Sequence, residues 1–432
     1  MRWIPAFAGA LACAFLLGPA RAQPAAADKD KYVSREEYEK LLKEMQQMRS
    51  ELETLKKQQA PPTTGVSQSE FDSTVDDLEK KIRAIKDAAK ASGIGQEKFI
   101  LTGYGIAEYI NREGENSTFN AQFNPIFDWK LTSRLMFEGE LEIAFEDEEA
   151  HVDLEYANIS YVVNNYIVVG GGKFLLPFAQ FNERLHPAWI NKLPDKPMAF
   201  ADGGIAPEAD IGAYIRGGFP IGSTRWNYAI YVSNGPGLIT DDRHTLGQLD
   251  FENFSDNNDN KAVGGRIGFL PIPELEVGYS FQYAKVNPND FGESVYTYLQ
   301  AVDLSYKRQV DWLKGTIDLR AEWVFSDVER ATYAVDSDRF RFLNNRNGGY
   351  AQIAYRPTLA GGDVLKNLEF VFRYDALFIP DSAPGAHDEQ RYTFGVDYWL
   401  SPSMVIKLAY QIDDREDGDD HNALFVQAAI GF

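Results

Sequence analysis

Cysteine is nearly absent from this sequence: the only one among the 432 residues is Cys13, inside an apolar N-terminal leader. Arg2 supplies a positive n-region, residues 4–17 form an apolar h-region, and Ala-Arg-Ala at 20–22 is a cleavage site. We therefore predict a signal peptide over residues 1–22, with lipoprotein processing at Cys13 as the alternative. Cleavage after residue 22 leaves a mature chain without cysteine, which excludes disulfides, thiolate metal sites and cysteine nucleophiles.

Long apolar runs are also missing. No stretch of about 18 apolar residues follows the leader, so the mature chain has no transmembrane helix and any membrane span must be a closed β-barrel. The net charge of −21 argues against a nucleic-acid partner, which needs basic stripes. The five histidines are dispersed without an H-x-x-x-H pair, and no catalytic constellation can be assembled. We therefore predict no enzyme activity, no cofactor and no metal site.

Apolar residues repeat with the 3-4 spacing of a coiled coil over residues 34–59. A proline-rich break at 60–65 separates this segment from a second heptad pattern between Phe71 and Ala89. We predict a periplasmic coiled-coil region over residues 23–97 that forms an oligomerisation seam. A lone amphipathic helix packed on the rest of the protein is the alternative. The seam of the first helix consists of Tyr38, Leu41, Met45, Met48, Leu52 and Leu55.

From residue 98 onward the period of the pattern changes to two. In 391–398, for example, polar or small residues alternate with aromatic or aliphatic ones. Soluble sandwiches alternate in the same way, but here the connections sort into tight turns and long polar loops, as in outer-membrane proteins. We predict an all-β, 16-stranded antiparallel transmembrane β-barrel over residues 98–432, preceded by the α-helical coiled coil. The sixteen candidate strands are 98–111, 118–131, 134–146, 151–163, 166–174, 210–220, 224–234, 261–270, 274–286, 295–307, 313–327, 346–358, 365–378, 389–400, 403–413 and 421–432.

The longest loop inside the strand set spans residues 175–209. It begins within the stretch G-K-F-L-L-P-F at 172–178, and N-E-R follows at 182–184. These motifs, the coiled coil and the sixteen strands resemble the phosphate-selective porin family, outer-membrane porins with an N-terminal coiled coil. The resemblance implies that the loop folds into the lumen as a constriction and that the chain is a homotrimer. A loop across the mouth is the alternative. The one-sign ladder of basic residues on which phosphate selectivity of the family depends is not seen here.

Charged residues follow the polar face of the predicted strands. A charge on the lipid face costs about 2–4 kcal/mol at mid-membrane, so we expect these side chains in the lumen. Opposed acidic and basic arcs either create a transverse field or form ion pairs that brace the lumen. The acidic arc comprises Glu138, Glu140 and Glu142, and the basic arc Arg216, Arg225 and Arg266. Further expected pore-lining bases are Lys173, Arg184, Lys192, Arg320 and Arg373.

These patterns together predict an outer-membrane porin for the passive diffusion of small polar or anionic solutes, with phosphate among the candidates. The expected surroundings are outer-membrane lipid and lipopolysaccharide, with the coiled coil in the periplasm. The C-terminal strand, which ends in Phe432, is expected to engage the barrel-assembly machinery. The alternative is a tether, in which the coiled coil binds peptidoglycan and the barrel serves only as an anchor.

Overall fold

The computed structural model describes Lys80 and residues 99–432, except 147, 148, 252–254, 257, 336, 385, 387, 417, 419 and 420. The chain divides into two units, Met1–Glu97 and Lys98–Phe432. The predicted signal peptide, the coiled-coil seam and the proline-rich break lie outside the described residues, so they stay predictions.

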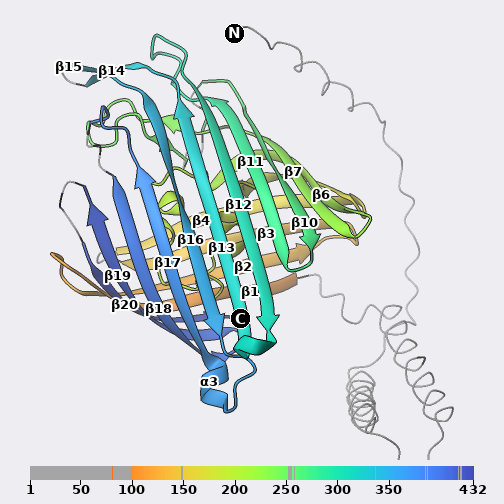
Figure 1. Ribbon diagram of the computed structural model, residues 1–432. Coiled ribbons are helices and arrows are strands. Elements are labelled where there is room, and N and C mark those ends of the chain that lie inside the picture. Colours follow the sequence, from red (N-terminus) through yellow and green to blue (C-terminus); the bar gives the residue numbers. More distant parts are fainter. Residues whose placement is uncertain are drawn as a thin grey trace, which may run out of the picture. The chain divides into compact units, whose positions relative to one another are not determined.

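Sixteen strands form one closed barrel, in which each strand pairs with its neighbour in the chain and β1 closes the ring with β20 (Figure 1). The predicted antiparallel barrel and its strand number are thereby confirmed. The largest departures from the predicted strand ends are three residues, at the end of β12 (310 against 307) and the start of β17 (368 against 365). The barrel strands are β1 (Phe99–Arg112), β2 (Thr118–Lys130), β3 (Leu135–Glu146), β4 (Glu149–Asn164), β5 (Ile167–Leu175), β6 (Ala209–Ile221), β7 (Thr224–Ser233), β10 (Ala262–Ile272), β11 (Leu275–Lys285), β12 (Tyr296–Val310), β13 (Gly315–Val328), β16 (Asn344–Arg356), β17 (Leu368–Phe378), β18 (Glu389–Ser401), β19 (Met404–Arg415) and β20 (Ala423–Gly431).

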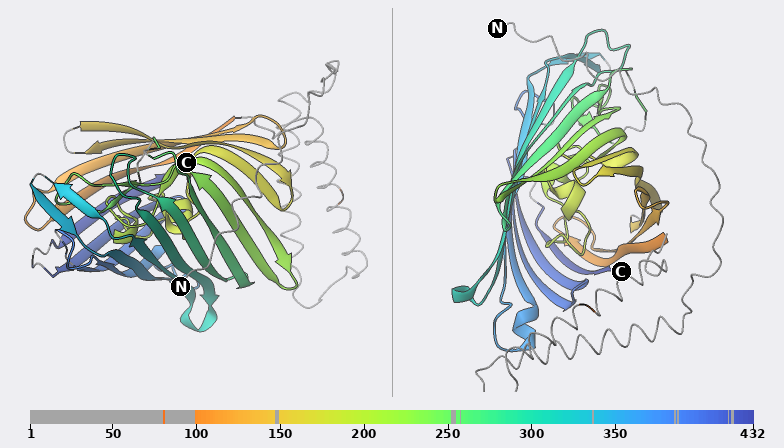
Figure 2. Two further views of the ribbon diagram at one scale, coloured as in Figure 1. Left: turned by 90° about the horizontal axis from the view of Figure 1, so that it is seen from above. Right: turned by 90° about the vertical axis from the view of Figure 1, so that its right-hand side faces the viewer.

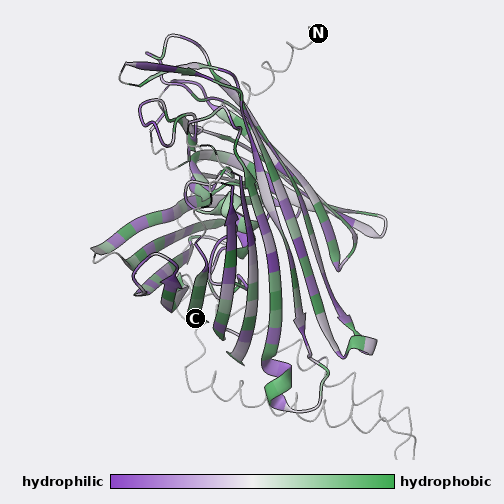
Figure 3. Ribbon diagram, turned by 60° about the vertical axis from the view of Figure 1, so that its left-hand side comes forward, coloured by the Kyte–Doolittle hydropathy of each residue, from purple (hydrophilic) through white to green (hydrophobic). Residues whose placement is uncertain are grey.

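The outer face of the barrel is apolar. On β19 the side chains of Ile406 and Leu408 are 41% and 50% exposed, whereas Lys407 and Gln411 on the other register are 1% exposed. Figure 3 shows the same alternation as hydrophobic and hydrophilic bands along the strands. An outward apolar belt over an interior that carries the polar side chains is the arrangement that a bilayer stabilises. Among the described residues, no helix has the length and apolar character to span a membrane.

The two rims of the barrel are built differently. Tight turns occupy one rim, together with helix α3 (Asp363–Asn367) and the 3-10 turn Asp311–Leu313. Long loops occupy the opposite rim, as the positions of α3 and of β14 and β15 in Figure 1 show. These loops contain two short hairpins that the sequence did not predict: β8 (Gly237–Leu238) with β9 (Leu249–Asp250), and β14 (Thr332–Val335) with β15 (Asp338–Arg341).

Candidate functional site

The segment between β5 and β6, residues 176–208, lies inside the ring of strands; we call it the lumen loop. In the right-hand view of Figure 2 it is the yellow-green chain within the barrel. Its backbone N–H groups at Ala179 and Gln180 donate to Ser280 Oγ (2.9 Å) on β11 and Glu322 Oε2 (2.8 Å) on β13. These bonds satisfy backbone donors that would otherwise be buried without partners. The loop is therefore tied directly to the barrel wall.

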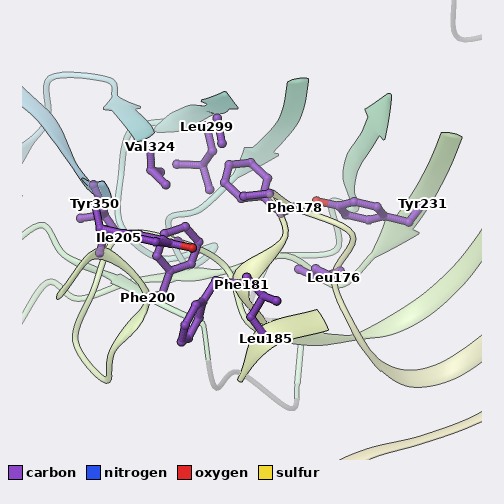
Figure 4. Close-up of a cluster of buried hydrophobic side chains, with 14 of the residues drawn as sticks. Leu176, Phe178, Phe181, Leu185, Phe200, Ile205, Tyr231, Leu299, Val324 and Tyr350 are labelled. Atoms are coloured by element: carbon purple, nitrogen blue, oxygen red, sulfur yellow. The ribbon is translucent and has the colours of Figure 1, made fainter. Parts of the chain in front are cut away.

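An apolar cluster fastens both ends of the lumen loop to the wall. Phe178, Phe181 and Phe200 are at most 2% exposed. In Figure 4 they lie against wall residues of β7, β12, β13 and β16, with Tyr350 at one end of the cluster. The rings of Phe181 and Phe200 meet Tyr350 edge-on, with centroid distances of 6.1 and 6.0 Å. One residue could have indicated this cluster from the sequence. Leu299 is an apolar side chain at a strand position that faces the lumen, where a polar residue is expected.

Ion pairs fasten the middle of the loop to β17. Lys192 forms a salt bridge with Glu369 and lies 3.8 Å from Asp318. Arg373, whose side chain is fully buried, binds Asp195 of the loop at 2.8 Å. The predicted pore residues Lys192 and Arg373 thus lie in the lumen, but as anchors of the loop. Pattern reasoning missed Asp195 because its importance depends on a partner 178 residues away.

Lys407 adds an anchor from β19. Its Nζ donates to the carbonyl oxygens of Ala188 (2.5 Å) and Leu193 (3.4 Å) in the loop. Arg320, a further predicted pore residue, makes two hydrogen bonds to Asp318 of its own strand, at 2.9 and 3.2 Å. It is half-buried, and its charge is matched by that carboxylate.

A second charge cluster joins the loop to β10, β11 and β12. Arg184 Nη1 lies 3.2 and 3.0 Å from the two carboxylate oxygens of Glu276. Arg266 donates to the same Glu276 at 2.9 Å and to Asp303 at 2.6 and 2.9 Å. The Arg266 side chain is 2% exposed and that of Asp303 is fully buried. Both predicted pore arginines are therefore neutralised by carboxylates.

The predicted basic arc does not assemble as a unit. Arg216 faces the lumen and pairs with Glu183 of the loop at 2.8 Å, whereas Arg225 lies exposed at the start of β7, next to a tight turn. Lys173 pairs with Ile211 across β5 and β6; it lines the smaller cavity described below, and its Nζ donates to the carbonyl oxygen of Leu154.

The acidic arc, by contrast, stays together on β3. Glu140 is 1% exposed and accepts a hydrogen bond from Asn124 at 3.1 Å, and Glu142 accepts one from Gln122 at 2.6 Å. Glu138 precedes them on the same face and is half-buried. Within the described part of the chain, none of these three carboxylates has a salt-bridge partner. The acidic arc therefore has no paired counter-charge, whereas Arg216 and Arg266 of the basic arc are paired with carboxylates.

Two cavities lie between the lumen loop and the β3 side of the barrel. The larger, of about 570 Å³, is lined by Glu138, Glu140, His186 and Arg216 among others. The smaller, of about 300 Å³, is lined by Glu142 and further carboxylates of β4 and the loop. Both cavities thus lie between the anchored loop and the barrel wall.

His186 sits in the loop at the edge of the larger cavity. Its Nδ1 lies 2.5 Å from the carbonyl oxygen of Asn182, and its Nε2 has no hydrogen-bond partner in the part of the chain that the structure describes. Burial, together with the charge of Lys196, lowers the pKa of His186 to about 4. The ring is therefore neutral at pH 7, with Nδ1 donating and Nε2 left as an acceptor.

Acidification is expected to loosen the loop through His186. A folded-state pKa below the ordinary 6.5 means that its stabilising contribution is complete above about pH 6.5 and is lost as the pH falls toward 4. We expect open-channel current noise to grow over this pH range. A His186→Phe variant, which keeps a ring beside Tyr104, should not show this pH-dependent increase in current noise. Identical pH profiles for the two proteins would contradict the assignment.

Neither a family model nor a curated protein sequence matches this chain. Solved structures do. OmpF of Salmonella typhi, in complex with daunomycin, has a TM-score of 0.51 and 14% identity, over 77% of this chain and 97% of that one. The fold is that of a porin. A second porin-like structure, the outer membrane channel DcaP of Acinetobacter baumannii, has a TM-score of 0.50 and 14% identity, again over 77% and 97% of the two chains.

Proposed function

We propose that this protein is an outer-membrane porin through which small polar solutes diffuse passively, with the lumen loop as its constriction. A barrel of sixteen strands is wide enough to enclose an aqueous channel. The observation that carries the proposal is the open volume of about 570 Å³ between the anchored loop and the barrel wall. An anchor for a cell-wall tether needs no barrel of this size, so the tether is not favoured.

The charges that remain unpaired favour cations. The larger cavity is lined by three carboxylates and three arginines, and the smaller by six carboxylates and two lysines. All three arginines are held by carboxylates, as is Lys196 by Glu208 at 3.2 Å. Glu138, Glu140 and Glu142 are not neutralised in this way. This distribution supports a cation preference over the anion or phosphate preference that the family resemblance implies.

The test is the reversal potential of purified full-length protein in a planar bilayer under a KCl gradient. We expect discrete conductance steps and a reversal potential whose sign shows K⁺ crossing more readily than Cl⁻. The opposite sign, or block by low concentrations of phosphate, would contradict the cation preference and support the phosphate hypothesis. No conductance from folded, inserted barrels would refute the channel and favour the tether.

We further propose a homotrimer that the predicted coiled coil holds together in the periplasm. Deletion of residues 23–97 is expected to leave the barrel folded but to lower the temperature at which the trimer dissociates, because the heptad seam is lost. Light scattering of the heated detergent complex measures this directly. A trimer of unchanged stability would refute the clasp.

The outer-membrane location, with contact to lipid and lipopolysaccharide, belongs to the same proposal. So does recognition of the C-terminal strand by the barrel-assembly machinery. In the closed barrel Phe432 is half exposed on the outer face, and its ring stacks on Phe123 with a centroid distance of 5.7 Å. An outward aromatic end is accessible to such machinery before β20 pairs with β1.

A further inference from the structure

Large apolar side chains are exposed at the tight-turn rim of the barrel. Trp312, in the turn Asp311–Leu313 between β12 and β13, is 81% exposed. Val364 and Leu365 of α3, in the connection between β16 and β17, are 63% and 51% exposed. Both connections lie where the strands end, and α3 extends past the neighbouring strands (Figure 1). Their apolar side chains are therefore outside the wall of the barrel itself.

The two connections are held together through their backbones. The N–H of Leu359 donates to the carbonyl oxygen of Lys314 at 3.0 Å, and the Tyr355 hydroxyl donates to that of Leu313 at 2.5 Å. Leu359 is itself 42% exposed. We call residues 308–314 and 356–367 together the rim platform. A contiguous exposed apolar patch of this kind marks contact with another protein or with a membrane.

The rim platform is basic, although the chain as a whole has a net charge of −21. It contains four basic and two acidic residues. Arg356 is engaged, since its Nε donates to the carbonyl oxygen of Lys366 at 2.8 Å. The side chains of Arg308, Lys314 and Lys366 are exposed. The patch therefore complements a surface that is both apolar and negatively charged.

The rim platform also continues the lipid-facing wall. Arg308 follows Leu304, which is 37% exposed, on the outward register of β12. Phe370, three residues after the end of α3, is 47% exposed on the outward register of β17. Tryptophan and long basic side chains at the edge of an apolar belt lie in the headgroup layer, with their apolar parts toward the hydrocarbon and their charges toward phosphates.

We propose that the rim platform binds anionic phospholipids of the leaflet that adjoins the tight-turn rim. Trp312 and the apolar side chains of α3 enter the boundary between headgroups and acyl chains, while the exposed basic side chains hold the phosphates. Residues 23–97, a possible alternative occupant, contain 15 acidic and 13 basic residues and so complement the platform far less. The inference rests on the proposed outer-membrane location.

The experiment uses a fluorophore on Leu365→Cys of the full-length protein, in a Cys13→Ala background that removes the one native cysteine. The protein is inserted into phosphatidylcholine vesicles with phosphatidylglycerol as the minor lipid, and a headgroup quencher is carried by one lipid or the other. We expect the share of phosphatidylglycerol beside the fluorophore to exceed its share in the bilayer about fivefold, the effect of one basic side chain at an anionic surface. Lys314→Gln/Lys366→Gln should reduce this enrichment to less than about twofold.

The matched control is Arg339→Gln/Arg341→Gln on β15, which removes two exposed basic side chains from the opposite rim. It should leave the enrichment unchanged. A second fluorophore position, Leu408→Cys on the outer face of β19, reports insertion of every variant through quenchers on the acyl chains.

Equal quenching by the two lipids would overturn the inference, as would equal loss of enrichment in the two double variants. If the fluorophore at 365 escapes both quenchers while that at 408 is quenched, the barrel is inserted but another segment covers the platform. The inference is then overturned and the proposed location stands. No quenching at 408 would refute the membrane location itself, and this inference with it.

Discussion

Excision of the lumen loop is expected to raise single-channel conductance by on the order of several-fold, because a sixteen-stranded barrel without an inserted loop leaves a wide aqueous lumen. Leu176 N donates to the carbonyl oxygen of Glu208 at 2.8 Å, so the two ends of the loop lie side by side. A short Gly-Ser linker can therefore replace residues 178–206. The wall carboxylates and arginines that the loop now covers would become hydrated, which a water-filled lumen tolerates.

The matched control is removal of the β14–β15 hairpin, residues 332–341, at the long-loop rim. Because this hairpin lies at the rim and not among the residues that line either cavity, its loss should change conductance far less than loss of the lumen loop. Folding of each variant is checked by its heat-dependent migration on gels. If the loop-free barrel folds and its conductance equals that of the unmodified protein, the lumen loop is not the constriction.

Arg266→Ala is expected to lower the free energy of unfolding by about 3–5 kcal/mol, the usual cost of removing one partner of a buried ion pair. The variant leaves Asp303, whose side chain is fully buried, without the guanidinium that now lies 2.6 Å away. Glu276 loses one of its two arginines. Urea unfolding of the protein in lipid vesicles measures the change.

Arg225→Ala is the matched control. It was predicted to lie in the same basic arc, yet it is exposed beside a tight turn, so its loss should change stability by less than about 0.5 kcal/mol. The double variant Arg266→Ala/Asp303→Ala should lower the free energy of unfolding by less than the sum of the two single variants, because it leaves no unpaired charge in this pair. Equal effects of Arg266→Ala and Arg225→Ala would show that the buried cluster does not stabilise the barrel.

The barrel was predictable because its constraints are local. Because lipid covers one side of every strand, every second residue must be apolar, and this pattern can be read from residues that are adjacent in the sequence. The sorting of connections into turns and long loops then separated a membrane barrel from a soluble sandwich. Strand ends came out within three residues even at β12 and β17, where the departures are largest. The same local logic placed Glu138, Glu140 and Glu142 together on β3.

The pairing of charges inside the lumen was not predictable, because it depends on the path of the loop. Lys192 meets Glu369 across 177 residues, and Arg266 meets Asp303 across an intervening strand. Alternation places Glu369, Arg266 and Asp303 in the lumen, and Lys192 follows from the position of the loop, but neither says which of these side chains touch. By itself, the sequence determined that this chain forms a sixteen-stranded barrel with a charged interior. Only the tertiary structure decided which charges are neutralised, because an ion pair stabilises at contact distance and is screened beyond about 10 Å.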